Sequence, residues 1–220
     1  MKNIYNALML KKLLIQKELG AKYIGPLKEF KEEQVSLPNT IESLRGLTLN
    51  CHLCELSKTR QNVVFGDGNT DADLMFIGEA PGASEDSKGT AVAGRSGELL
   101  TKMIENVLHI PRDSVYIANI VKCKPPQNRQ ISSNEAEICK PFLMKQIEII
   151  KPKLIVALGA TAYQYLSNDD TPINKIRGHI LTDKEYSIIP TYHPNYLLRN
   201  PSAKKEAFED MLKVKSFLGL

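Results

Sequence analysis

Short apolar runs alternate with amphipathic segments along most of this chain of 220 residues. The runs are bounded by turn residues and predict buried strands at residues 74–77, 115–121, 153–158 and 188–191, with a further β-extension near residues 178–181. Apolar residues at helical spacing predict helices at residues 40–47, 96–108, 134–150, 161–166 and 202–217. Strands that alternate with helices favour parallel pairing with helices on both faces. The pattern therefore predicts an α/β fold, a three-layer α/β/α sandwich with a four-stranded, mostly parallel sheet.

The first 39 residues differ from the rest. Apolar positions with lysines between them follow helical spacing over residues 3–20 and stop at Gly20, which predicts one amphipathic helix. Prolines and a run of charged residues predict a linker over residues 25–39. We therefore expect an N-terminal helical arm and linker over residues 1–39 and one domain over residues 40–220. Packing of the arm on its own domain is favoured over a partner-binding or membrane-surface role.

The composition is ordinary for a globular protein, 42% hydrophobic and 25% charged, and suits one substantial core. No apolar run approaches the roughly 20 residues that a bilayer span needs, so no transmembrane helix is expected. Lysines interrupt the N-terminal segment and no small-residue cleavage site follows, so we expect no secretory signal and a cytoplasmic protein. A net charge of +4 and a pI near 8.7 permit a nucleic-acid partner without demonstrating one.

The loop over residues 78–86 directly follows the first predicted strand. Gly78 and Gly82 allow close backbone approach and Pro81 stiffens the segment between them, so the loop can hold its amides and carboxylates in fixed positions. Ligands of open α/β sheets usually bind in such a bay at the carboxyl end of a strand. A tight connection between a strand and a helix is the alternative interpretation.

Two further polar residues lie at the ends of other predicted strands. Asn119 carries both a donor and an acceptor, which suits the edge of a planar base, although it could equally cap a turn. His193 follows the last strand, and a single histidine is more often structural than catalytic. Because the carboxyl ends of parallel strands share one rim with the 78–86 loop, we expect one binding site there.

Residues 122–130 form a rigid, polar and basic loop. Prolines fix its shape, and Lys122, Lys124 and Arg129 are each placed to meet a phosphate of a nucleic acid. A solvated surface loop would have the same composition.

Four cysteines form the remaining cluster of potential ligands: Cys51, Cys54, Cys123 and Cys139. Disulfides are unusual in the cytoplasm, so a Cys-x-x-Cys with two later single cysteines indicates four thiolates around one metal centre. Zinc and iron–sulfur clusters both use four thiolates. The later pair lacks a compact knuckle, which favours a cluster that bridges distant elements, and four ordinary buried thiols are the alternative.

Five motifs combine these features in one order. They are Cys51-x-x-Cys54 with Thr59-Arg60, Val64-Phe65-Gly66-Asp67-Gly68, Gly78-Glu79-Ala80-Pro81-Gly82 with Glu85-Asp86, residues 119–126 with Asn128-Arg129, and His193-Pro194 with residues 196–201. From about Thr40 to the C-terminus the chain thereby resembles the family 4 uracil-DNA glycosylases, which carry an iron–sulfur cluster. The resemblance implies a 4Fe-4S cluster on the four cysteines, the glycosylase fold and a monomeric protein.

The resemblance also implies a monofunctional DNA repair enzyme. Such an enzyme hydrolyses the N-glycosidic bond of uracil in single- or double-stranded DNA and leaves an abasic site. The nucleotide must leave the base stack to reach a pocket, at a cost of about a few kcal/mol. By analogy with the family, Asn119 binds the uracil edge at N3 and O4 and His193 donates to O2. Backbone amides of Gly78, Glu79 and Ala80 support the same pocket.

Other roles follow by the same analogy. Gly82 belongs to the substrate loop, and Glu85 crowds the C5 side of the base and excludes the methyl group of thymine. Other branches place an aspartate where this chain has Ala80, so we expect a dissociative reaction in which Glu79 orients water. The turn after the histidine supplies a wedge and a phosphate contact, or is a plain helix entry; its residues are Tyr196, Leu197, Leu198 and Arg199.

One position departs from the family pattern. The family usually has a phenylalanine that stacks on the flipped base, and Val92 occupies that position here. Stacking on an aromatic side chain contributes about 1–3 kcal/mol per base. Tyr192 and Phe65 are the residues that could replace the missing ring, and we expect uracil excision to survive. The alternative is a protein that binds uracil-DNA or abasic DNA with reduced, altered or no glycosylase activity.

Overall fold

The computed structural model describes residues 14, 15, 17–20, 37–182 and 186–220. The chain divides into two compact units, Met1–Ser36 and Leu37–Leu220. Residues 14, 15, 17 and 18 are helical, and the rest of the helix expected over residues 3–20 lies outside the described residues. The expected linker lies outside them as well, except for residues 37–39. The second unit contains the sheet and all the candidate site residues.

The sheet of the second unit has the order β1-β3-β2-β4-β6-β5 in the described part of the chain. Its four inner strands are parallel to one another: β3 (Tyr116–Asn119), β2 (Leu74–Gly78), β4 (Leu154–Leu158) and β6 (Ser187–Thr191). Two antiparallel edge strands, β1 (Asp67–Gly68) and β5 (Leu181–Thr182), extend the predicted four-stranded sheet to six strands. Each edge strand has two residues, too few to show a period in the sequence.

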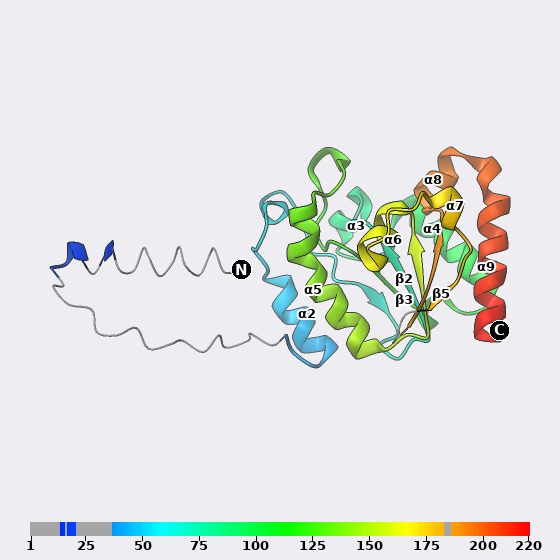
Figure 1. Cartoon of the computed structure of the whole chain (residues 1–220), viewed down its shortest axis with the longest axis horizontal. Coiled ribbons are helices and arrows are strands. Elements are labelled where there is room, and N and C mark those ends of the chain that lie inside the picture. The colour runs from blue at the N-terminus through cyan, green and yellow to red at the C-terminus, as the bar shows by residue number, and fades with distance from the viewer. Residues whose placement is uncertain (1–13, 16, 21–36, 183–185) are drawn as a thin grey trace. The chain divides into compact units, whose positions relative to one another are not determined.

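Helices cover both faces of this sheet, which confirms the predicted three-layer class (Figure 1). Alternate side chains of β2 separate the two cores because successive strand residues point to opposite faces. Met75 and Ile77 pack with α2 (Ile41–Leu49), α5 (Ser133–Ile150) and α6 (Ala160–Ser167). Leu74 and Phe76 pack with α4 (Gly94–Met103) and α9 (Lys204–Leu218).

Local signals explain where the long helices begin and end. Thr40 caps α2 by accepting a hydrogen bond from the Ser43 N–H at 3.2 Å. Ser132 and Glu135 form a capping box at the start of α5, in which each side chain accepts from the backbone of the other residue. The helix predicted over residues 96–108 is α4 followed by a π-helical turn, η2 (Ile104–Leu108).

Several short helices were not predicted. Helix α3 (Ala83–Lys88) lies within the residues that we expected to form only loop and turn, and α7 (Ile173–Ile176) follows later. Helix α8 (Pro194–Arg199) agrees with the helix entry that was the alternative for residues 196–199. Single 3₁₀ turns complete the chain at η1 (Glu55–Lys58), η3 (Arg112–Ser114), η4 (Pro126–Asn128) and η5 (Pro201–Ala203). No helix in the described residues is long and apolar enough to cross a membrane.

Candidate functional site

Asn119 and His193 line one small cavity at the carboxyl ends of the inner strands. The cavity has a volume of about 50 Å³, and its polar lining includes Glu85 and Ser96. Ala91, Val92 and Leu100 supply an apolar wall. Asn119 and His193 therefore lie on one rim, as expected from the sequence. Parallel strands have their carboxyl ends at the same edge of the sheet, so the residues at these ends lie close together.

Gly78 allows the two polar side chains to approach each other. It pairs with Asn119 in the sheet, and a Cβ atom on Gly78 would lie 2.5 Å from Asn119 Oδ1 and 3.7 Å from His193 Nε2. Any larger residue would therefore displace the Asn119 amide. The Asn119 side chain is nearly buried, with a residue exposure of 8%, so its amide is held against the end of β2.

The orientation of His193 is fixed by the first turn of α8. Its Nδ1 atom accepts a hydrogen bond from the Asn195 N–H at 3.0 Å, so the proton of the neutral ring is on Nε2. Burial, and to a smaller extent the Arg199 guanidinium, lower the pKa of His193 from its ordinary 6.5 to about 4. At neutral pH the residue is thus an uncharged donor, with Nε2–H on the cavity side.

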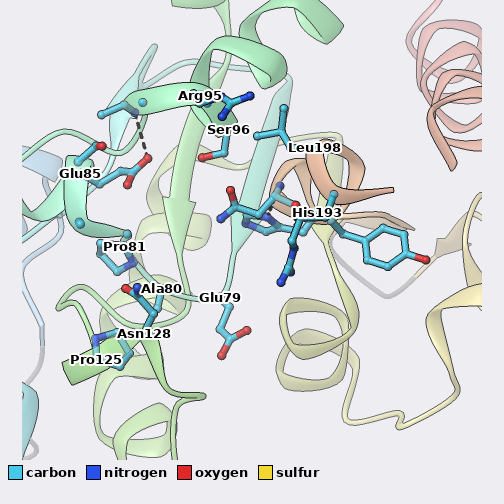
Figure 2. A pocket seen from close by; sticks show the side chains of 18 of the residues that line it. Glu79, Ala80, Pro81, Glu85, Arg95, Ser96, Pro125, Asn128, His193 and Leu198 are labelled. Atoms are coloured by element: carbon cyan, nitrogen blue, oxygen red, sulfur yellow. Dashed lines mark hydrogen bonds between the residues drawn. The ribbon is translucent and has the colours of Figure 1, made fainter. Parts of the chain in front are cut away.

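Glu85 forms the acidic wall of the cavity. Its Oε1 atom accepts a hydrogen bond from the Ala93 N–H at 3.2 Å, and its Oε2 atom would lie 2.7 Å from a Cβ on Gly82. The absence of a side chain at Gly82 therefore leaves room for the carboxylate. Since Glu85 is 9% exposed and anchored to the 91–93 segment, it is a fixed boundary of the cavity (Figure 2).

Val92 also faces the cavity, but no aromatic side chain among the described residues lines it. The two aromatic residues expected to replace the missing ring are engaged elsewhere. Tyr192 stacks on Tyr196 with ring centroids 4.9 Å apart, and Phe65 is buried beneath the guanidinium of Arg45 at 5.1 Å. The contact that Val92 offers is therefore purely aliphatic.

A larger groove of about 810 Å³ adjoins the cavity and shares His193 and Glu85 with it. Figure 2 shows Arg95, Ser96 and Leu198 on the same side of this opening and Glu79 below His193. The expected DNA contacts that line it are Arg129, Tyr196, Leu198 and Arg199. The sequence analysis missed Arg95; its position directly after Gly94, at the start of a helix on the same rim, was the available signal.

Two charged side chains of the groove already have partners. Arg129 donates to both carboxylate oxygens of Glu135, at 2.9 and 2.6 Å, and this pairing lowers the pKa of Glu135 from 4.5 to about 2. Glu79 Oε1 accepts from the Ile131 N–H at 3.3 Å. Both contacts hold the groove wall to the start of α5.

Two expected DNA contacts are corrected by the structure. Lys122 is 1% exposed, because its Nζ atom donates to the Asn119 carbonyl at 2.9 Å and to Gln146 Oε1 at 2.6 Å. Burial lowers the pKa of Lys122 from 10.5 to about 8. Leu197 is likewise 1% exposed and packs in the core beside α9, so it cannot act as a wedge. Lys124 is half-buried and does not contribute to the groove lining.

The four cysteines line a second, enclosed cavity of about 10 Å³ between α2, η1 and α5. None of them forms a disulfide. Cys123 Sγ accepts a hydrogen bond from Arg60 Nη1 at 3.2 Å, and Cys139 Sγ accepts from the Lys122 backbone N–H at 3.3 Å. Burial raises the pKa of Cys139 to about 11. Among the described residues, no three histidine, cysteine or acidic side chains are arranged to hold a metal ion.

Comparison with known proteins identifies related chains. The family described as the uracil DNA glycosylase superfamily matches residues 65–213. The chain is 45% identical over 174 residues to the type-4 uracil-DNA glycosylase of Thermotoga maritima, covering 76% of this chain and 89% of the relative. It is 43% identical over 176 residues to that of Saccharolobus solfataricus (76% and 82%) and 40% identical over 185 residues to that of Sulfurisphaera tokodaii (80% and 84%).

Proposed function

Because the chain belongs to the type-4 uracil-DNA glycosylases of the uracil DNA glycosylase superfamily, we propose that it excises uracil from DNA in repair. The reaction hydrolyses the N-glycosidic bond and leaves an abasic site. One observation supports this assignment above all others: Asn119 and His193 line one cavity, and a Cβ atom on Gly78 would lie 2.5 Å from Asn119 Oδ1 and 3.7 Å from His193 Nε2. Membership of the family agrees with this geometry.

Asn119 is the proposed reader of the uracil edge. In a flipped nucleotide the N3–H of uracil donates to the amide oxygen and O4 accepts from the amide nitrogen. Cytosine presents an acceptor and an amino group at these positions, so both contacts would be reversed. Because Gly78 has no side chain, Asn119 Oδ1 can occupy space that a Cβ would fill, since the two would lie only 2.5 Å apart. An amide placed in this way selects uracil over cytosine, and Glu85 limits the space beside the base.

His193 is the proposed stabiliser of the leaving group. Negative charge gathers on uracil O2 as the glycosidic bond lengthens, and a donor that is already aimed at this charge lowers the barrier. The Nε2–H of a neutral imidazole provides that donor without proton transfer, and the Asn195 N–H holds the ring in place. Backbone amides of Gly78, Glu79 and Ala80 border the same site.

Water addition follows departure of the base. Ala80 provides no carboxylate, so we propose a dissociative reaction in which the sugar develops oxocarbenium character before water attacks. Glu79 lines the groove next to His193, and its Oε1 atom is held by the Ile131 N–H at 3.3 Å. The carboxylate can accept a hydrogen bond from water on the groove side of the sugar. Glu79 thus orients the nucleophile.

The groove is the proposed path of DNA. Arg95 and Arg199 lie on its rim as exposed cations that can meet phosphates, and Arg129 adds a third beside Glu135. Leu198 and Tyr196 are exposed enough to fill the gap left by a flipped base. Single- and double-stranded DNA both present the phosphates and the extruded base that these groups require.

We also propose that Cys51, Cys54, Cys123 and Cys139 hold a 4Fe-4S cluster. All four thiols border one enclosed cavity, and hydrogen bonds to the sulfurs of Cys123 and Cys139 suit thiolate ligands. The cluster would be held by the four cysteine thiolates that line this cavity. When bound, the group supplies a structural cross-link between η1 and α5.

Other features of the proposal concern the whole chain. We propose that the protein acts as a monomer, as the resemblance to the family implies. The four cysteines outside disulfides suit the reducing cytoplasm. The catalytic domain is proposed to span residues 40–220. A protein that only binds uracil-DNA is not favoured, because the relatives named above are glycosylases.

Release of uracil tests the proposed function. The purified full chain, with its visible absorption recorded, is incubated with an oligonucleotide that carries one uracil, and abasic sites are revealed by alkaline cleavage. We expect cleavage at uracil and none in matched oligonucleotides that carry thymine or cytosine. Asn119→Ala and His193→Ala should each lower kcat by roughly 10²-fold or more. Intact uracil with the wild-type protein, or full activity of both variants, would contradict the assignment.

A further inference from the structure

Lys122 is a buried cation whose position the proposed chemistry does not explain. Its ammonium group forms two hydrogen bonds, to the Asn119 carbonyl at 2.9 Å and to Gln146 Oε1 at 2.6 Å. No carboxylate in the described residues forms an ion pair with it. Burying an ammonium group costs free energy that hydrogen bonds offset, and here two neutral oxygen atoms accept them.

The first of these contacts fixes the residue that reads the base. Lys122 lies three residues after Asn119, and its side chain turns back to bind the carbonyl at the end of β3. The Asn119 backbone is then held from two sides, by its pairing with Gly78 in the sheet and by this ammonium group. The backbone of Asn119, from which the side-chain amide extends, is therefore less free to rotate.

The second contact anchors Lys122 to the core. Gln146, on α5, accepts from Lys122 and donates through Nε2 to the Phe65 carbonyl and to the Tyr116 hydroxyl, both at 3.0 Å. Gln146 is fully buried, and Tyr116 is at the other end of the strand that carries Asn119. The network therefore spans β3 from its beginning to its end and ties it to α5.

Lys122 also borders the cysteine cavity. Its backbone N–H donates to Cys139 Sγ at 3.3 Å, and the residue belongs to the lining shared by the four cysteines. One residue thus contacts a cysteine through its backbone and the Asn119 carbonyl through its side chain. A displacement of the Cys139 region must move Lys122, and with it the peptide of Asn119.

We propose that Lys122 is a positioning residue that holds the Asn119 amide at the uracil edge and connects it to the four-cysteine centre. The role in base selection rests on the proposed function, whereas the placement of the amide does not. The amide needs to be held within about 0.5 Å of its productive position. Lys122 does not line the cavity, and its contact with the Asn119 carbonyl restrains the backbone from which the side-chain amide extends.

Lys122→Met tests this role, because it keeps an unbranched side chain that is one atom shorter and removes the donor. We expect kcat/KM for uracil release, per cluster-loaded protein, to fall by roughly 10- to 100-fold. Inhibition by free uracil should weaken relative to inhibition by free cytosine, since a displaced amide discriminates less. Lys153→Met is the matched control: Lys153 pairs at the surface with Asp73, just before β4, and its loss should change neither readout.

Gln146→Met is a second test of the proposal if Lys122→Met folds poorly, and the same two quantities are measured. It loosens the hold on Lys122 but leaves the contact to Asn119, so we expect a smaller loss of selectivity in the same direction. A purely structural role predicts that rate falls only with the folded, cluster-loaded fraction while the ratio of uracil to cytosine inhibition stays constant. That result would overturn the proposal.

Crystal structures separate this proposal from the proposed function. In Lys122→Met the Asn119 amide should move by more than about 0.5 Å, whether or not the wild-type protein releases uracil. An amide that stays in place in the variant overturns the positioning role. A wild-type protein that releases no uracil overturns the enzyme assignment alone.

Discussion

At the scale of single residues, the site depends on groups that are held before substrate arrives. Asn119 is held between Gly78 and Lys122, and His193 is held by the first turn of its own helix. A preorganised donor loses no energy to reorientation during the reaction, which is why such placement accelerates bond cleavage. The protonation state of His193 is therefore a measurable test of the arrangement.

The His193 ring should be neutral, with its proton on Nε2, between about pH 5 and 8. Its pKa is lowered to about 4 by burial and by Arg199, so protonation begins only as the pH falls toward that value. The added proton takes the acceptor site at Nδ1 and breaks the bond from the Asn195 N–H. Nitrogen-15 NMR of labelled histidine reads tautomer and pKa directly. A ring that titrates near 6.5 would show that it is not buried as described.

Val92 gives a second prediction at this scale. Its side chain supplies the apolar contact at the position where the family has a stacking ring, and it packs against Gly97. We expect Val92→Ala to raise KM by several-fold and Val92→Phe to lower it by about 5- to 100-fold, because stacking contributes about 1–3 kcal/mol per base. Steady-state kinetics on a single-stranded uracil oligonucleotide distinguishes these directions. A higher KM for Val92→Phe would mean that the ring fills the cavity itself.

At the scale of elements, α5 connects the groove to the cysteine cavity. Its N-terminus carries the capping box of Ser132 and Glu135 and the pair with Arg129, and its first turns carry Cys139. Glu135→Gln should destabilise the fold by about 1 kcal/mol, because glutamine can keep the capping box but loses the ion pair with Arg129. Urea unfolding at pH 7 measures this change, with the exposed Glu137→Gln on the same helix as the control.

The same carboxylate predicts an acid dependence. The pKa of Glu135 is about 2 in the folded protein against an ordinary value of 4.5, so the unfolded chain binds the proton more tightly. The stabilisation is complete above about pH 4.5 and is lost as the pH falls toward 2. Glu135→Gln should therefore lose stability less steeply than wild type in this range. Parallel curves for both proteins would contradict the pairing.

The elements also show what the pattern of residues can predict. The inner strands and the long helices were found because their apolar spacing extends over at least one full turn or several strand residues. Helices α3, α7 and α8 have four to six residues and carry little apolar periodicity. For helices this short, the capping residues and prolines at their ends are the signals that remain in the sequence. The predictions that Lys122 and Leu197 contact DNA were wrong. The sequence shows which residues a loop or turn contains but not the direction in which their side chains point.

At the scale of the whole molecule, the base cavity lies at the carboxyl ends of the inner strands, whereas the cysteine cavity lies between α2, η1 and α5. Cys51 and Cys54 precede the first strand, whereas Cys123 and Cys139 flank the loop that leads to α5. A cluster would therefore join segments that are far apart in the sequence. Loss of the cluster should detach residues 50–62 from the rest of the domain before the sheet unfolds.

Limited proteolysis of a Cys51→Ala/Cys54→Ala double variant tests this order. We expect early cleavage within residues 50–62, loss of visible absorption near 400 nm, and a sheet that still unfolds cooperatively. Leu53→Ala is the control, because Leu53 lies between the two cysteines but is exposed. Simultaneous loss of absorption and of all secondary structure would show that the centre is required for the entire fold.

The outermost strands of the sheet have a consequence for behaviour in solution. Among the described residues, β1 and β5 contribute two residues each, so the sheet ends on either side in a stub that offers few unpaired amides and carbonyls. A neighbouring chain finds almost no template on which to add a strand. Edges as short as these guard the protein against fibre formation and against edge-to-edge pairing with its own copies.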